Sequence, residues 1–248
     1  GDMVNCAVEL GMPAVAITYH GYMYGVPELG LACDAVNHGT PEYKVWSHDK
    51  SFLTKGRRDE LEVPDPEKNP RGYAQFQRDM EEWDRSGNLD ATKPPLVIKP
   101  IFGCEVYFTP DDTLARDRKP ELYHMVLFAR NETGSVNLMQ TVSEAAVDGF
   151  YYKPRVTLDN LRRHREGLIA SSACIAGIIP KCIDRGDLDA AVRWAETFRD
   201  LFEPGSFYIE IQEHGITTDS GLTDEQLDRQ LIDIANQVGV KVIATNDF

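Results

Sequence analysis

The feature that most constrains the fold of this chain is the alternation of short apolar runs with longer stretches of helical spacing. Seven short runs have the predominantly apolar character of strands buried on both faces, at 14–18, 97–101, 106–108, 125–129, 168–171, 207–211 and 240–245. Apolar residues recur at helical spacing in most of the intervals, at 2–10, 26–36, 134–146, 188–202 and 223–238. The alternation predicts an α/β protein made of βα units around a parallel sheet. We expect this sheet to close into a barrel, with an open sheet as the alternative.

Composition limits the class of protein. The chain has 248 residues, of which 42% are hydrophobic and 27% are charged, and this balance is typical of a folded, water-soluble protein. The length allows one large barrel or two small domains. No apolar run reaches the roughly 18 residues that a membrane span needs, and the first residues lack the basic and apolar segments of a secretion signal. We therefore expect a cytoplasmic protein with no membrane partner.

Charge and cysteine content disfavour three further classes of protein. The net charge of −14 disfavours a free-standing binder of duplex DNA, which usually presents a basic face. A phosphate-processing site is still compatible with an acidic protein, because bound divalent metals supply positive charge. The five cysteines form no CxxC pair, which disfavours both a disulfide scaffold and a zinc ribbon. They are Cys6, Cys33, Cys104, Cys174 and Cys182.

Residues 40–95 interrupt the alternation. This segment holds six of the 14 prolines and many charges, and it contains no strong strand pattern. Only Tyr73–Arg85 has the spacing of a helix. A connection of this length is uncommon inside a compact domain. We predict a solvated surface insertion that can be shortened without loss of the fold, with a dedicated binding element as the alternative.

Side chains with metal-ligand chemistry lie next to the predicted strands. In α/β sheets and barrels, sites form at the carboxyl ends of the strands, so the residues that follow each apolar run are candidates. The candidates that follow a run are His20, Glu105, Cys174, His214 and Asp247, whereas His124 precedes its run. Imidazole, carboxylate and thiolate groups are the ligands of Zn²⁺ and similar first-row metals. The pattern predicts a metal site, and the alternative for each residue is a packing role.

Six segments in this order resemble the motifs of the PHP (polymerase and histidinol phosphatase) domain. They are AVAITYHGYMYG around His20, IKPIFGCEVY around Glu105, ELYHMVLFA around His124, GLIASSACIAG around Cys174, FYIEIQEHG around His214 and VIATND around Asp247. Two more stretches, GFYYKPRV (149–156) and ETGSVNLMQ (132–140), are more similar to the form of the domain in the bacterial replicative DNA polymerase III α subunit than to histidinol phosphatases. The resemblance covers nearly all of the chain outside 40–95, and it implies a distorted (β/α)₇ barrel with a long insertion.

The resemblance also implies a metal centre. Members of the family hold up to three Zn²⁺, Mn²⁺ or Fe ions, and the positions that match their ligands are His20, Glu105, His124, Cys174 and Asp247. His214 matches a position that we expect on the substrate side. The implied chemistry is metal-assisted phosphoester hydrolysis, which in polymerase-linked members can be a 3′–5′ exonuclease.

The parent protein implied by the resemblance is a DNA-directed DNA polymerase, a nucleotidyltransferase. Its partners would be DNA, a proofreading subunit and other replicase subunits. The Mg²⁺ ions of nucleotidyl transfer would be held by a palm domain downstream of this segment.

Three departures from the family pattern affect the expected activity. The family domain begins with an HxH strand and ends with N-D-x-H, so we expect residues 1–248 to be a PHP domain whose two ends are missing, within a longer subunit. Inside the chain, the usual T-D-H-G reads Thr18-Tyr19-His20-Gly21. Tyr19 thus replaces a carboxylate that steadies the metal shell, and the loss of such a group typically costs about 10–100-fold in affinity or activity.

These departures favour one of three hypotheses. The favoured one is a degenerate metal-site barrel that serves as a structural and docking module of the polymerase α subunit in chromosomal DNA replication. The alternative is an active, metal-dependent 3′–5′ exonuclease that proofreads. A stand-alone phosphatase similar to histidinol phosphatase is disfavoured by the polymerase-like GFYYKPRV stretch.

Overall fold

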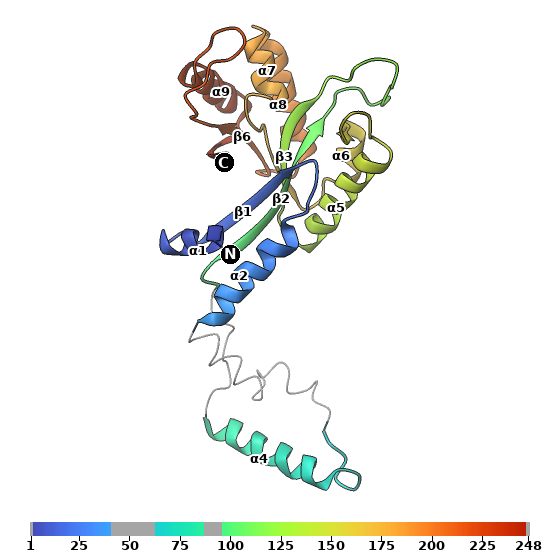
Figure 1. Ribbon diagram of the computed structural model, residues 1–248, viewed down its shortest axis with the longest axis vertical. Helices are drawn as coiled ribbons and strands as arrows, with labels where there is room; N and C mark the ends of the chain where they lie inside the picture. Colours follow the sequence, from blue (N-terminus) through green and yellow to red (C-terminus); the bar gives the residue numbers. More distant parts are fainter. Residues whose placement is uncertain (1, 41–62, 87–95, 247–248) are drawn as a thin grey trace. The chain divides into compact units, whose positions relative to one another are not determined.

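A computed structural model describes residues 2–40, 63–86 and 96–246 of the chain (Figure 1). Two compact units are present, one made of Gly1–Val15 and Glu28–Pro100 and the other of Ala16–Pro27 and Ile101–Phe248. Two strands, β1 (Ala14–His20) and β2 (Lys99–Phe108), contribute residues to both units. Among the described residues, no helix combines the length and the apolar character that crossing a membrane requires.

The described residues of the first unit lie mainly in helices. They are α1 (Asp2–Glu9), most of α2 (Val26–Gly39) and α4 (Pro70–Ser86). In α4, Pro70 occupies the first helical position, where its missing N–H costs nothing. The Asn69 carboxamide oxygen accepts a hydrogen bond from the N–H of Gly72 at 3.0 Å, which caps the helix. The helix predicted at Tyr73–Arg85 is therefore confirmed, and it begins one turn earlier because of this cap.

A single side chain ties the two flanks of the segment 40–95 together. The Asn37 amide of α2 donates to the carbonyl oxygen of Ile98 at 2.9 Å. Its oxygen accepts from the N–H groups of Val97 and Ile98 at 2.8 and 3.0 Å. The chain thus departs after α2 and returns before β2 at one place. Residues 41–62 and 87–95 lie outside the described residues, so the insertion stays a prediction.

A mixed sheet forms the centre of the second unit. Within the described residues it has seven strands in the order β1-β2-β3-β5-β6-β7, with β4 paired to β2. The later strands are β3 (Tyr123–Ala129), β4 (Arg155–Val156), β5 (Leu168–Ser171), β6 (Phe207–Ile211) and β7 (Lys241–Ala244). The sheet curls into part of a barrel, which confirms the predicted distorted PHP-type α/β fold.

The strand directions differ from the parallel arrangement that the alternation predicted. Strands β5, β6 and β7 are parallel, but β3 is antiparallel to both β2 and β5. The reversal arises because residues 109–122, which join β2 to β3, contain no helix, so β3 returns beside β2 as a long hairpin instead of crossing over. The predicted run 106–108 and all of the run 97–101 except its first two residues belong to the single strand β2, in which residues 103–105 stay paired with β3.

Helices cover the sheet of the second unit. They are α5 (Glu132–Val147), α6 (Leu158–His164), α7 (Ile178–Asp184), α8 (Leu188–Leu201) and α9 (Asp224–Val238). Polar side chains cap four of them: Asn131, Thr157, Asp187 and Thr223 each accept a backbone N–H of the first turn. The core includes an aromatic cluster in which Phe108 of β2 contacts Trp194 and Phe198 of α8, with ring centroids 5.5 and 5.3 Å apart. These contacts anchor α8 on the sheet that carries the candidate site.

Candidate metal centre

Three side chains from neighbouring strands converge at one end of the sheet. His20 ends β1, Glu105 lies within β2 and His124 is near the start of β3. The His20 Nε2 atom lies 3.0 Å from one carboxylate oxygen of Glu105, and the other oxygen contacts Nδ1 of His124. One ligand atom from each residue lies within 4.8 Å of the other two. The carboxylate of Glu105 therefore joins two imidazoles.

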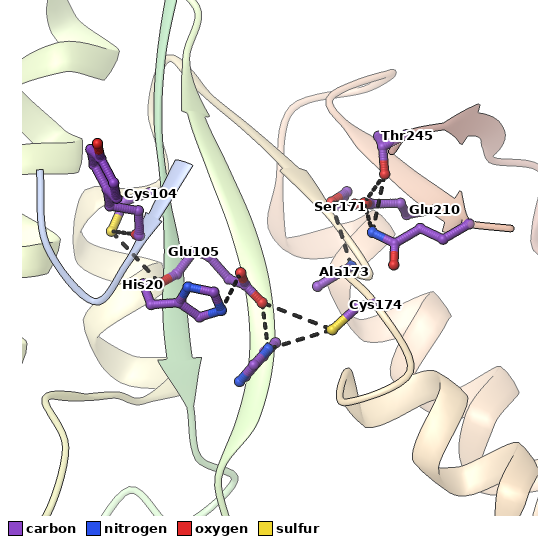
Figure 2. Close-up of polar contacts among 11 residues, drawn as sticks. His20, Cys104, Glu105, Ser171, Ala173, Cys174, Glu210 and Thr245 are labelled. Atoms are coloured by element: carbon purple, nitrogen blue, oxygen red, sulfur yellow. Dashed lines mark hydrogen bonds and ion pairs between the residues drawn. The ribbon is translucent and has the colours of Figure 1, made fainter. Parts of the chain in front are cut away.

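Cys174 approaches the same carboxylate from the other side (Figure 2). Its Sγ atom lies 3.5 Å from Nδ1 of His124 and 3.9 Å from Oε1 of Glu105. The turn after β5 places it there: the N–H of His124 donates to the carbonyl oxygen of Ala176 at 3.0 Å. A Cβ atom at Gly177 would lie 2.0 Å from the Ser172 oxygen, so this turn needs glycine. The turn therefore holds the thiol next to the imidazole.

The direction of β3 explains the position of His124. This residue precedes its apolar run, unlike the other candidates, and for that reason it fitted the sequence pattern poorly. Because β3 is antiparallel to β2 and β5, its start lies at the edge where those strands end. His124 pairs with Tyr107, two residues beyond Glu105. The exception in the pattern thus follows from the hairpin and supports a common site.

Among the described residues, the ion-pair partners of Glu105 are two histidines. The residue is buried, and in the described part of the chain no lysine or arginine forms an ion pair with it. The pKa of His124 is raised to about 10, first by its hydrogen bond with Cys174 and then by its contact with Glu105. These two contacts therefore favour the protonated form of the His124 ring. A metal at the site would bring a positive charge of its own.

The neighbouring thiol, Cys104, has a different role. Burial raises the pKa of Cys104 to about 12, so this side chain stays protonated. Its Sγ atom donates to the carbonyl oxygens of Tyr19 and Tyr22 at 3.3 and 3.4 Å. The N–H of Gly21 also donates to the carbonyl oxygen of Glu105 at 2.6 Å. These bonds fix the backbone of the turn after His20. Cys104 therefore has a structural role and is not part of the cluster formed by His20, Glu105, His124 and Cys174.

Comparison with known proteins identifies the family. The sequence profile of the PHP domain matches residues 1–214. This chain belongs to the PHP domain family. Among curated proteins it is similar to the DNA polymerase III subunit alpha of Treponema pallidum, with 37% identity over 153 residues, and to that of Helicobacter pylori (strain J99), with 39% over 160 residues. The counterpart from Aquifex aeolicus is 35% identical over 158 residues.

Each of these alignments covers 60% of this chain and 13% of the relative. The chain thus spans a small part of the length of the polymerase subunits that it matches.

The PHP domain brings together four of the five residues that matched family ligands: His20, Glu105, His124 and Cys174. The fifth, Asp247, lies outside the described residues. Their assignment as ligands stays a prediction, but the donor set fits a metal. Two nitrogen ligands, a carboxylate and a thiol are the combination that Zn²⁺ and related first-row ions accept. The buried carboxylate without a lysine or arginine partner also suits a cation.

Two other predicted positions lie away from the cluster contacts. The Tyr19 ring lies over Gly25, since a Cβ atom at Gly25 would be 2.3 Å from Tyr19 Cε2. Adjacent residues of a strand point to opposite faces, so Tyr19 and the cluster residue His20 diverge. His214 is exposed in the loop after β6, where its N–H donates to Asp224 at 2.8 Å. The described contacts of His214 do not include the cluster.

A second buried carboxylate of the PHP domain was not expected from the sequence. Glu210 of β6 accepts hydrogen bonds from the hydroxyl groups of Ser171 and Thr245 and, at 2.9 Å, from the Gln212 amide (Figure 2). The N–H of Glu210 donates to Ser172 Oγ at 2.9 Å. The signal was present, because a glutamate inside the apolar run FYIEI must find donors when it is buried. The sequence could not show which residues supply them.

Proposed function

We propose that this chain is the PHP domain of a DNA polymerase III α subunit and that its metal centre hydrolyses phosphodiester bonds in DNA during replication. The observation that carries the proposal is the convergence of His20, Glu105 and His124, with Cys174 in contact. The relatives that share this domain are DNA polymerase III α subunits, which supports DNA as the substrate. In this proposal the reaction is the 3′–5′ removal of nucleotides from a DNA end.

The described residues suit this role through their burial and orientation. His20, Glu105, His124 and Cys174 would hold the metal, which when bound polarises a phosphoryl oxygen and lowers the pKa of a coordinated water. Glu105 fixes both imidazoles, because each carboxylate oxygen contacts one ring. The side chain of His20 is 52% exposed and that of His124 is 23% exposed. The side of the centre next to His20 is therefore the open one, and we place the substrate there.

Other elements of the proposal come from the family resemblance. Asp247 would complete the ligand set and His214 would lie on the substrate side. The Mg²⁺ ions of DNA synthesis would be held elsewhere in the parent polymerase. A proofreading subunit and other replicase subunits would be its partners.

The segment 40–95 would be an insertion in the domain. The bonds of Asn37 to Val97 and Ile98, which join its flanks, support this assignment.

A second candidate function is a docking module with a degenerate site. Tyr19, which stands where the family motif has a carboxylate, favours it. In this alternative the centre binds metal weakly or only for stability, and the domain acts by holding other replicase subunits.

The test compares the chain with its Glu105→Gln variant and a matched control, Glu210→Gln, which alters an equally buried carboxylate. Metal content is measured by elemental analysis after reloading with Zn²⁺ or Mn²⁺. Hydrolysis is followed with an end-labelled single-stranded oligonucleotide. We expect the chain and the Glu210 variant to bind metal and hydrolyse the strand, and the Glu105 variant to do neither. Metal binding without hydrolysis in the parent chain favours the docking module, and equal metal content in all three proteins contradicts the proposed centre.

A further inference from the structure

The loop that leads from α5 to β4 is held by a buried arginine. Arg155, which is 2% exposed, donates from Nε to the carbonyl oxygen of Gly149 at 2.7 Å. Its terminal nitrogens donate to the carbonyl oxygens of Ala115 and Leu114, both at 2.9 Å. All three acceptors are backbone atoms, so the guanidinium hydrogen-bonds to the loop 149–154 and to the loop between β2 and β3. The loop 149–154 is therefore a rigid part of the domain.

The same loop exposes the ring of Tyr152, whose backbone conformation is strained. The N–H of Tyr151 donates to the carbonyl oxygen of Lys153 at 3.1 Å, which closes a tight turn around Tyr152. Tyr152 has φ of 61°, in the left-handed region that residues with side chains seldom adopt. Its side chain is nonetheless 71% exposed, so the strained backbone is not offset by burial of the ring. Strain of this kind is typical of functional positions.

Lys153 brings an ammonium group close to the metal centre. Its Nζ atom lies 5.1 Å from the centre of the Tyr107 ring, in a cation–π contact. The Tyr107 ring in turn lies 5.5 Å from the ring of His124 and 6.5 Å from that of His20, measured between centroids. Across the described residues, Lys153 forms no ion pair with a carboxylate. The Lys153 ammonium is therefore a positive charge without an ion-pair partner among the described residues, separated from the metal centre by the Tyr107 ring, in a chain with a net charge of −14.

A second aromatic group follows His20 directly. The rings of Tyr22 and Tyr24 are stacked, with centroids 5.0 Å apart and an angle of 9° between them, and Tyr24 is exposed. The turn that carries them touches the loop of Arg155, because a Cβ atom at Gly21 would lie 3.1 Å from Cγ of Pro154. Exposed aromatic faces and an available cation thus lie on the two loops that flank His20. Single-stranded nucleic acids are bound by this combination, in which bases stack on rings and cations contact phosphates.

We propose that Tyr152, Lys153 and Tyr24 form a rim that holds a single-stranded DNA end beside the metal centre. Lys153 contacts a backbone phosphate, and the rings of Tyr152 and Tyr24 stack on unpaired bases. Because stacking needs bases that are free of a partner strand, the rim selects single-stranded over duplex DNA. This inference rests on the proposed function, and it identifies the residues that position the substrate.

The experiment measures binding apart from hydrolysis. Fluorescence anisotropy of a fluorescein-labelled oligothymidylate is recorded with the chain in EDTA, over a series of salt concentrations. The variants are Lys153→Gln, Tyr152→Gly and Tyr152→Phe. Glycine accepts the positive φ at position 152, so Tyr152→Gly removes the ring without harming the turn. Lys241→Gln is the matched lysine control, because Lys241 is exposed and begins β7 at the opposite edge of the sheet.

We expect Tyr152→Gly to weaken binding about tenfold without loss of thermal stability, in line with the effect of removing a stacking ring. Lys153→Gln should weaken binding severalfold and reduce the dependence of binding on salt by about one phosphate contact. Tyr152→Phe, which keeps the ring, should lose much less affinity than Tyr152→Gly, and Lys241→Gln should bind like the parent chain. Unchanged binding by Tyr152→Gly and Lys153→Gln overturns the rim, as does equally tight binding of a duplex or no binding by the parent chain.

The rim and the proposed function fail separately. If the variants behave as expected in EDTA but no metal supports hydrolysis, the rim stands and the hydrolytic function is wrong. If the chain hydrolyses DNA and the variants keep their affinity and KM, the function stands and the rim is wrong.

Discussion

Two buried glutamates, Glu105 and Glu210, lie within strands of the same sheet and are each 5% exposed. They differ in the chemistry of their neighbours. Glu105 contacts two imidazoles and a thiol, all of which have lone pairs for a metal. Glu210 is surrounded by two hydroxyl groups and an amide, which donate hydrogen bonds to it.

The difference shows that burial of a carboxylate does not by itself indicate a cation site. A carboxylate whose oxygens are all hydrogen-bonded by donors has a structural role. Glu210 is of this kind, because it links β5 and β6 to Thr245, which follows β7. Neighbours that can themselves bind a metal leave a role for a shared cation, and Glu105 has neighbours of this kind. The comparison leads to four predictions.

The largest expected effect is on metal affinity. We expect Glu105→Gln to weaken Zn²⁺ binding by at least about 100-fold, the upper end of what loss of a supporting partner costs. Glu210→Gln should leave the affinity within about threefold, because its neighbours are donors rather than ligands. Competition with a chromophoric chelator measures both values. A similar loss in the two variants would remove the distinction between the two glutamates.

The second prediction reverses the comparison and concerns stability. Glu210→Met leaves the hydroxyls of Ser171 and Thr245 without their acceptor, so the free energy of unfolding should fall by about 2–3 kcal/mol. Urea unfolding of chelator-treated protein measures this change. The matched variant is Ser171→Ala, which removes one donor and should cost about 1 kcal/mol. A Glu210→Met protein as stable as the parent would show that the network contributes nothing.

A third carboxylate extends the comparison to pH. Burial alone would raise the pKa of Asp184, but hydrogen bonds from Ser220 and Thr218 outweigh it and lower the pKa from 3.8 to about 2. Because the folded-state pKa is depressed, this stabilisation is complete above the unfolded value and is lost as the pH falls from about 4 towards 2. Asp184→Asn should therefore cost about 1 kcal/mol at neutral pH and less at pH 3. Urea unfolding of both proteins at several pH values checks the sign, and a constant difference contradicts it.

The smallest expected effect concerns Tyr19. The family motif suggests that a carboxylate here would raise metal affinity, but the Tyr19 ring lies over Gly25 and points away from His20. We expect Tyr19→Asp to change Zn²⁺ affinity by less than tenfold. Isothermal titration measures the change, and Tyr19→Asn controls for loss of the ring. A larger gain that Asn does not reproduce would support the degenerate-site alternative.

Much of the fold could be predicted from the sequence, because strands buried on both faces appear as apolar runs. Strands β5 and β6 have the bounds that were predicted, 168–171 and 207–211. Helix α7 was not predicted, because five of its seven residues are buried and it has no polar face to show a period. The direction of β3 could not be predicted from its apolar run alone, since it depends on the hairpin that β3 forms with β2.

The individual residues of the candidate site could be predicted from the sequence, but the hydrogen bonds that join buried side chains near it could not. Motif order identified His20, Glu105, His124 and Cys174, which the structure brings together. Sequence spacing carried no signal for the two hydroxyl partners of Glu210, which come from positions 171 and 245. Contacts between residues so distant in the chain depend on the register of strands, and register is a property of the folded sheet.

The bonds of Asn37 to Val97 and Ile98 have a consequence for how this protein can change over time. If the segment 40–95 is the insertion that we propose, one amide joins its two ends, and its length should have little influence on the remainder of the domain. Doubling such a loop costs only about 0.6 kcal/mol in closure entropy. On that proposal, evolution or a protein engineer could exchange the intervening sequence for another module while Asn37, Val97 and Ile98 are kept.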